Sequence, residues 1–239
     1  MIRNIIAIAM KEIRSYFGSP MAYVIGAFFV GLTGFFFIDA LSVPFPVASV
    51  RGFLDRAVVL IMPIWAPIIT MRLLAEEQKL GTLELLMTAP VRDSEIVLGK
   101  FIASLVIFLG TLSFTIWFVL LLFVFGDPDI MPLLSAYVGF IMYGVAALSV
   151  GLLASSLSPN QIVAAVVGFG ILVILTISQE AARQVDGVAA VILEELAINS
   201  HLEDFLRGVL STRDFGYYLA IAAVFLFLTI RSLESRRWR

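Results

Sequence analysis

The sequence predicts an all-α polytopic membrane protein with six transmembrane helices. Of its 239 residues, 61% are hydrophobic and only 14% are charged, and the mean hydropathy is +1.03. Several uncharged runs exceed the ~20 residues that a helix needs to cross about 30 Å of hydrocarbon. These runs are continuously apolar, whereas strands of a transmembrane barrel alternate between apolar and polar residues. We therefore expect the whole chain, 1–239, to form a single transmembrane domain.

The N-terminal segment, residues 1–18, predicts an amphipathic helix lying in the membrane interface. Apolar residues recur at helical spacing as far as Tyr16, while Lys11, Glu12 and Arg14 share the opposite face. A signal peptide is the competing interpretation. It fits less well, because the next apolar run is longer than a typical signal-peptide core and no small-residue cleavage site ends it.

Six apolar segments follow, separated by charged residues or by turn-forming residues. They cover approximately residues 20–41, 57–74, 96–125, 132–155, 161–179 and 215–230. The second segment contains Pro63 and Pro67, which predict a kinked helix that either lines a transport path or has only a structural role. Residues 180–214 are too polar to span, and the Ser200–Glu203 pattern predicts a capping box that opens an outer helix continuing to about Leu210.

The distribution of basic residues predicts the orientation. If both termini and the loop between the second and third spans are cytoplasmic, eleven of the 16 lysines and arginines lie on that side. Basic residues accumulate on the cytoplasmic side of membrane proteins. We therefore expect six spans with both ends of the chain in the cytoplasm.

The loop between the second and third spans, residues 75–91, has more pattern than a linker needs. Gly81 interrupts the helix, Thr82 is a candidate N-cap, and a short segment rich in leucine follows until Pro90. This pattern predicts a short helix that is acidic on one side and apolar on the other. The alternative is a solvated charged loop that ends a helix.

Residues 76–91 read Glu-Glu-x-x-x-Gly-Thr-Leu-Glu-x-Leu-Leu-x-x-x-Pro-Val, which resembles the coupling-helix region of ABC type-2 exporter permeases. Residues 11–20 resemble the N-terminal helix that leads into the first span of that family. Residues 199–218 resemble its short outer helices before the last span. The resemblance covers most of the chain and is strongest to the short permeases of the gliding-motility (GldF-like) group.

The resemblance implies a permease subunit of an ATP-driven exporter in the cell inner membrane. The implied partners are two cytoplasmic ABC ATPase subunits carrying ATP and Mg, a second permease that is an identical or related chain, membrane lipid, and an outer accessory protein. The implied contact with the ATPase consists of Glu76, Glu77, Gly81, Thr82, Leu83, Glu84, Leu85 and Leu86.

The chain itself is not expected to be an enzyme or to hold a cofactor. A phosphate-binding loop needs Gly-x-x-x-x-Gly-Lys-Ser/Thr, and the only Gly-Lys pair, at Lys100, is followed by Phe101. There is no cysteine, and the single histidine, His201, has only the adjacent Glu203 and Asp204 as partners for a metal. Basic patches interleaved with aromatic residues, which favour nucleic-acid binding, are missing from the sequence.

Two other functions remain open from the sequence. One is a membrane anchor or assembly component that does not transport. The other is an ion-coupled carrier that uses backbone carbonyls at the prolines of the second span. Carriers of this kind usually place a charged side chain at the membrane midplane, and the predicted spans have none there. Nucleotide-dependent stimulation of an ATPase would separate the exporter subunit from both.

Overall fold

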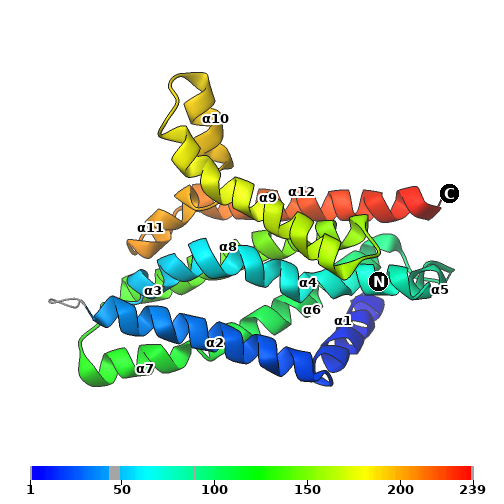
Figure 1. Cartoon of the computed structure of the whole chain (residues 1–239), viewed down its shortest axis with the longest axis horizontal. Helices are drawn as coiled ribbons and strands as arrows, with labels where there is room; N and C mark the ends of the chain where they lie inside the picture. The colour runs from blue at the N-terminus through cyan, green and yellow to red at the C-terminus, as the bar shows by residue number, and fades with distance from the viewer. Residues whose placement is uncertain (1, 43–48, 89, 238–239) are drawn as a thin grey trace.

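The computed structural model describes residues 2–42, 49–88 and 90–237, and every regular element within these ranges is a helix. Six helices are long and apolar enough to cross a membrane. The predicted fold class, an all-α polytopic membrane protein with six spans, is therefore confirmed. The chain is a multi-pass membrane protein, and Figure 1 shows its long helices lying side by side.

The helices follow one another through the described ranges of the chain in a simple order. They are α1 (Ile2–Phe17), α2 (Pro20–Leu41), α3 (Arg51–Arg56), the π-helix η1 (Ala57–Ile61), α4 (Met62–Lys79), α5 (Thr82–Thr88), α6 (Asp93–Ser113), α7 (Ile116–Phe125), α8 (Ile130–Leu157), α9 (Gln161–Ala182), α10 (Val188–Leu196), the 3-10 helix η2 (Ser200–Leu202), α11 (Glu203–Leu206) and α12 (Thr212–Arg237). The six spans are α2, α3–η1–α4, α6–α7, α8, α9 and α12.

Helix α8 forms the centre of the bundle. In the most apolar 18-residue stretch of α8, 83% of the residues are buried, against 17% in that of α2. Helix α8 packs against α4, α6, α9 and α12. Close packing is possible because Gly139, Gly144 and Gly151 leave room on α8 for Phe205, Phe108 and Thr70. The outer helices α2, α9 and α12 instead leave most of their apolar side chains partly or fully exposed, as lipid-facing helices do.

Two spans differ in detail from the segments predicted by hydropathy. The second continues without a break from Arg51 to Lys79, because Arg56, which marks the predicted start, forms an ion pair with Asp39 of α2. The third is interrupted between α6 and α7. There, Thr115 Oγ1 donates to Leu112 O (2.7 Å) and lies 2.9 Å from Tyr137 Oη of α8.

The predicted capping box at Ser200 is wrong. Ser200 Oγ donates to Glu194 O (3.0 Å) and Ala197 O (2.7 Å), so this hydroxyl caps the end of α10 instead of opening the next helix. The following helix, α11, ends at Leu206 and not near Leu210. Helix α10 folds back against α9 and projects from the bundle (Figure 1).

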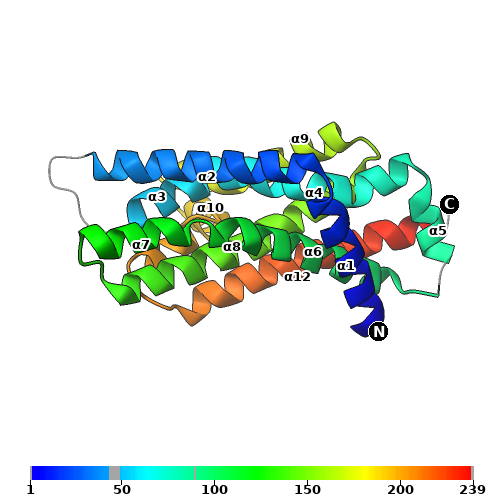
Figure 2. The same ribbon diagram turned by 90° about the horizontal axis from the view of Figure 1, so that it is seen from below.

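The short helix α5 lies at the same end of the bundle as the N-terminal helix α1 and the end of α12. Figure 2, the view from below, shows this arrangement along the whole length of the bundle. Helices α3 and α11 lie at the opposite end. The N-terminal helix, the loop between the second and third spans and the C-terminal end of α12, which the basic residues predict to be cytoplasmic, therefore lie at one end of the bundle.

Candidate coupling site

Helix α5 is joined to α4 by a tight turn at Gly81. Gly81 has a φ of +70°, in the left-handed region, where a side chain is strained. Leu80 N donates to Glu76 O (3.0 Å), which completes the last turn of α4. Thr82, the predicted N-cap, is the first residue of α5, and its hydroxyl donates back to Glu77 O (3.4 Å). A short helix thus follows Gly81, as the sequence predicts.

The leucines of this turn and helix face in different directions. Leu83 is only 4% exposed and belongs to the protein core, while Leu80 is 66% and Leu85 72% exposed. Leu86 is half-buried. The predicted contact residue Glu84 lies in α5, but its side chain is outside the part of the chain that the structure describes. One leucine therefore anchors α5, and two are free to contact another molecule.

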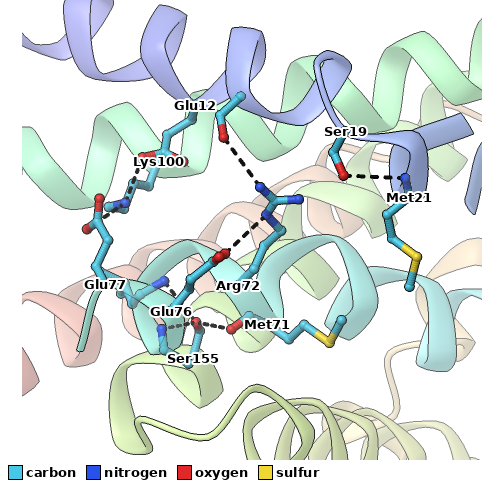
Figure 3. A network of polar contacts seen from close by, with 12 residues as sticks. Glu12, Ser19, Met21, Met71, Arg72, Glu76, Glu77, Lys100 and Ser155 are labelled. Carbon is cyan, nitrogen blue, oxygen red and sulfur yellow. Dashed lines mark hydrogen bonds and ion pairs between the residues drawn. The ribbon is translucent and has the colours of Figure 1, made fainter. Parts of the chain in front are cut away.

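The end of α4 that carries this turn is held by a network of four charges, in which Lys100, Glu12 and Glu77 are largely buried and Lys11 is 64% exposed. Lys100 Nζ of α6 lies 2.9 Å from Glu12 Oε1 of α1 and 2.8 Å from Glu77 Oε2 of α4 (Figure 3). Lys11 Nζ donates to Glu77 Oε1 (2.9 Å). The side chain of Lys100 is fully buried, and those of Glu12 and Glu77 are each 12% exposed. Two positive and two negative groups balance one another, as a buried charge requires.

This network attaches α1 to the end of α4, just before the turn at Gly81. Burial lowers the pKa of Lys11, but its hydrogen bond to Glu77 and the charges of Glu77 and Glu12 outweigh burial, so the pKa lies above its ordinary value. A second contact holds the other end of α1, where Asn4 Nδ2 donates to Glu95 Oε2 of α6 (3.2 Å). Helix α1 is therefore attached to α4 and α6 along its length.

On another side, the end of α4 is held by α8. Ser155 Oγ accepts hydrogen bonds from Leu74 N (3.0 Å) and Ala75 N (3.1 Å) and donates to Met71 O (2.8 Å), so it enters the backbone ladder of α4 (Figure 3). Gln78 Nε2 donates to the main-chain oxygens of Ser155 (3.3 Å) and Ser156 (3.0 Å). The residues just before the coupling turn are thus joined to the central helix.

We expect Ser155→Ala to destabilise the protein by about 1–3 kcal/mol, because the buried amides of Leu74 and Ala75 lose the hydrogen bonds that they donate to Ser155 Oγ. Thermal unfolding in detergent measures the loss, and hydrogen exchange at these two amides locates it. Ser235→Ala is the control, since Ser235 is exposed on α12. Equal unfolding temperatures for the two variants would contradict this role of Ser155.

The remaining residues singled out in the sequence occupy varied positions. Glu76 Oε2 lies 3.6 Å from Arg72 Nε, and Arg72 stands over the ring of the buried Tyr16. Arg14 is exposed. Pro63 and Pro67 are buried, and Pro67 packs near Gly168 of α9, which favours a packing role for this proline.

His201 stacks on Tyr217, with the ring centres 3.7 Å apart. Its Nδ1 lies 3.2 Å from Ala197 O, and its Nε2 lies 3.9 Å from Glu195 Oε2. Among the described residues, no group of three or more histidine, aspartate or glutamate side chains could hold a metal ion. The contacts of His201 are those of a packed aromatic ring.

Sequence reasoning missed Lys100, Gln78 and Ser155 as parts of this site. Lys100 is the one charge of α6 beyond its acidic first turn, and a cation at the start of an apolar run was a usable signal that it has a buried partner. Ser155 and Gln78 carried no such signal. They are 77 residues apart in the chain and meet only through the packing of α4 on α8.

The fold and site define a polytopic membrane protein with a short helix exposed at one end of the bundle. The family model described as "ABC-2 family transporter protein" matches residues 6–236, almost the whole chain. The chain belongs to the ABC-2 family transporter proteins, the membrane subunits of ABC transporters, which have no nucleotide-binding site of their own and associate with an ABC ATPase subunit. Comparison with curated proteins finds no match.

Proposed function

We propose that this permease subunit belongs to an exporter and that the Leu80–Gly81 turn with α5 is the surface bound by the ATPase. The observation that carries this proposal is the exposure of Leu80 and Leu85 at the end of the bundle, beside a stem held by α1, α6 and α8. An apolar side chain outside the hydrocarbon gains from burial against a partner. Because the end of α4 is held by three other helices, it transmits the movement of that partner to the membrane helices.

The proposed contact is narrower than the set of residues that the sequence suggested. Leu85 and Leu80 fill an apolar cleft of the ATPase, and Glu76, whose side chain is 40% exposed, faces basic groups at its rim. Leu83 and Glu77 act inside this chain, the first by packing and the second by ion pairing. Gly81 and Thr82 shape the turn.

The assembly that we propose contains two ATPase subunits with ATP and Mg and a second permease, either a second copy or a related chain. The α1–α5 end faces the cytoplasm, because most basic residues gather there, and the complex lies in the inner membrane. The segment around α10 and α11 is then the outer face, where an accessory protein has room to bind. The sequence motif of residues 76–91, which resembles that of the gliding-motility permeases, supports this arrangement.

We expect Leu85→Asp to abolish the association with the ABC ATPase subunit. Removing a central interface residue costs about 2 kcal/mol or more, roughly thirtyfold in Kd, and a buried unpaired carboxylate costs more. Co-purification in mild detergent, followed by ATP hydrolysis, measures both association and coupling. The unfolding temperature stays unchanged, because the Leu85 side chain is 72% exposed.

Two further variants sharpen this experiment. Leu210→Asp changes a leucine of similar exposure beyond α11 and is expected to bind the ATPase normally. Gly81→Pro disturbs the turn without touching the leucines, because proline cannot adopt a φ of +70°, and it is expected to insert into the membrane but lose coupling. Native-like association and hydrolysis with Leu85→Asp would refute the proposed contact. Association of the native chain without any effect on hydrolysis would favour a membrane anchor instead.

A further inference from the structure

A largely apolar groove opens on the side of the bundle, near the junction of α1 and α2. Its volume is about 470 Å³, within the ~300–1,000 Å³ range of small-molecule sites. It is bounded by the end of α1, the first half of α2, Trp65 of α4, the last two turns of α6 from Ile107, and Phe114 just beyond α6. Because α2 is the least buried span, the groove lies on the membrane-facing side of the bundle.

The residues that line the groove are uncharged, and the nearest basic side chains stand just outside one end of it. Arg72, near one end, has its guanidinium carbon 5.1 Å from the centre of the Tyr16 ring, and Tyr16 lines the groove. Trp65 lies seven residues earlier on the same helix, about 10 Å deeper at ~1.5 Å per residue. The exposed Arg14 lies two residues before Tyr16. A ligand with an anionic head and an apolar tail matches this arrangement.

Two buried hydrogen-bond donors at the groove have no partner. Tyr16 Oη and Trp65 Nε1 make no hydrogen bond to any described residue, and the two side chains are 3% and 1% exposed. Burial raises the pKa of Tyr16 to about 12, so its phenol keeps its proton and remains a donor. An unsatisfied buried donor costs about 1–3 kcal/mol, which an acceptor on a bound molecule would relieve.

We propose that this groove binds a diacyl phospholipid from the leaflet on the α1–α5 side. One acyl chain lies between α2 and α6, the phosphate lies near Arg72, and an ester carbonyl accepts from Tyr16 once this ring turns its hydroxyl toward the groove. Arg72 keeps its contacts with Glu76 and with Ser15 Oγ, so the head group adds a third acceptor for a guanidinium that has five donors. This proposal rests on the membrane location of the chain and not on the direction of transport.

Two glycines make the proposal testable without damage to the core. Gly26 of α2 and Gly110 of α6 both line the groove, and a Cβ added at either meets no heavy atom within 4 Å. Leucine at either position therefore fills the groove without a clash at Cβ, and it also favours the helix over glycine. Gly31 of α2 is equally open but does not line the groove, which makes Gly31→Leu the matched control.

The experiment is native mass spectrometry of the protein taken from nanodiscs of phosphatidylglycerol into mild detergent. We expect the native chain and Gly31→Leu to retain one phospholipid, and Gly26→Leu and Gly110→Leu, placed on different helices, to lose it. Arg72→Gln is expected to weaken retention through the head group alone. Thermal unfolding of each variant verifies that it is folded.

Two results would overturn the proposal. Equal phospholipid retention by the native chain and both filled variants would mean that the lipid binds elsewhere. A native dimer without a bound lipid, which becomes monomeric in the filled variants, would mean that a second copy of the chain covers the groove.

Discussion

Replacing Lys100 with methionine is expected to reduce stability by about 3 kcal/mol, because it removes the fully buried cation between two carboxylates and leaves them only the exposed Lys11 as a partner. Glu12 and Glu77 are each 12% exposed and lie within 3 Å of Lys100 Nζ. Methionine is unbranched and only one atom shorter than lysine, so the loss of the charge is the main change. Thermal unfolding in detergent measures the effect, and faster hydrogen exchange along α1 is expected to accompany it.

The controls separate this buried network from an ordinary surface ion pair. Arg183→Met breaks an ion pair with Glu180 in which both side chains are 64% exposed, and it is expected to cost less than about 1 kcal/mol. Combining Lys100→Met with Glu77→Gln and Glu12→Gln removes the unpaired charges, so the triple variant is expected to recover part of the loss. If Lys100→Met and Arg183→Met lower the unfolding temperature equally, the network has no special structural role.

Gly151→Leu is expected to prevent the normal packing of α4 on α8. A Cβ at Gly151 would lie 2.2 Å from Thr70 Oγ1 and 3.3 Å from Ala66 O. Thr70 cannot easily move, since it is fully buried and its hydroxyl donates to Ala66 O (2.8 Å). Overpacking costs about 1–3 kcal/mol or more. We expect a sharply lower yield of folded protein in detergent and a lower unfolding temperature.

The same change is expected to loosen the connection between α8 and the coupling segment. Ser155 lies one helical turn beyond Gly151 on α8, so a displaced α8 withdraws its hydroxyl from Leu74 and Ala75. Gly170→Leu is the control, because a Cβ at Gly170 of α9 meets no atom within 4 Å. Native yield and stability in Gly151→Leu would show that α4 and α8 do not pack as closely as described.

These two sites together suggest how the proposed coupling surface acts on the membrane helices. Glu77 is joined to α1 and α6, and its neighbour Gln78 is joined to α8. A displacement of α5 by the ATPase is therefore expected to reach three helices through adjacent residues. This mechanism depends on the proposed contact at Leu85 and would fail with it.

The sequence predicted the number of spans, because crossing a membrane imposes a local condition on length and apolarity that hydropathy measures directly. The turn at Gly81 was also predictable, since a left-handed residue favours glycine at that point in the chain. The ends of spans were less predictable. Arg56 looks like a boundary in the sequence, and only its ion pair with Asp39 allows the helix to pass through it.

The candidate site was predictable in place but not in its internal contacts. The pattern of residues 76–91 located the segment, yet the sequence assigned similar roles to Leu83 and Leu85. In the structure Leu83 is 4% exposed and Leu85 is 72% exposed. Their two positions on a seven-residue helix carry no such difference in the sequence, because burial depends on which side of α5 meets the bundle.

The sequence by itself determined that this chain crosses a membrane six times and carries a patterned helix between its second and third spans. Both properties depend on residues that are neighbours in the chain. The tertiary structure alone decided that Lys100 neutralises Glu12 and Glu77, that Ser155 enters the backbone of α4, and that a groove opens beside Tyr16 and Trp65. These features join residues that are far apart in the sequence, and the packing of the helices brings them together.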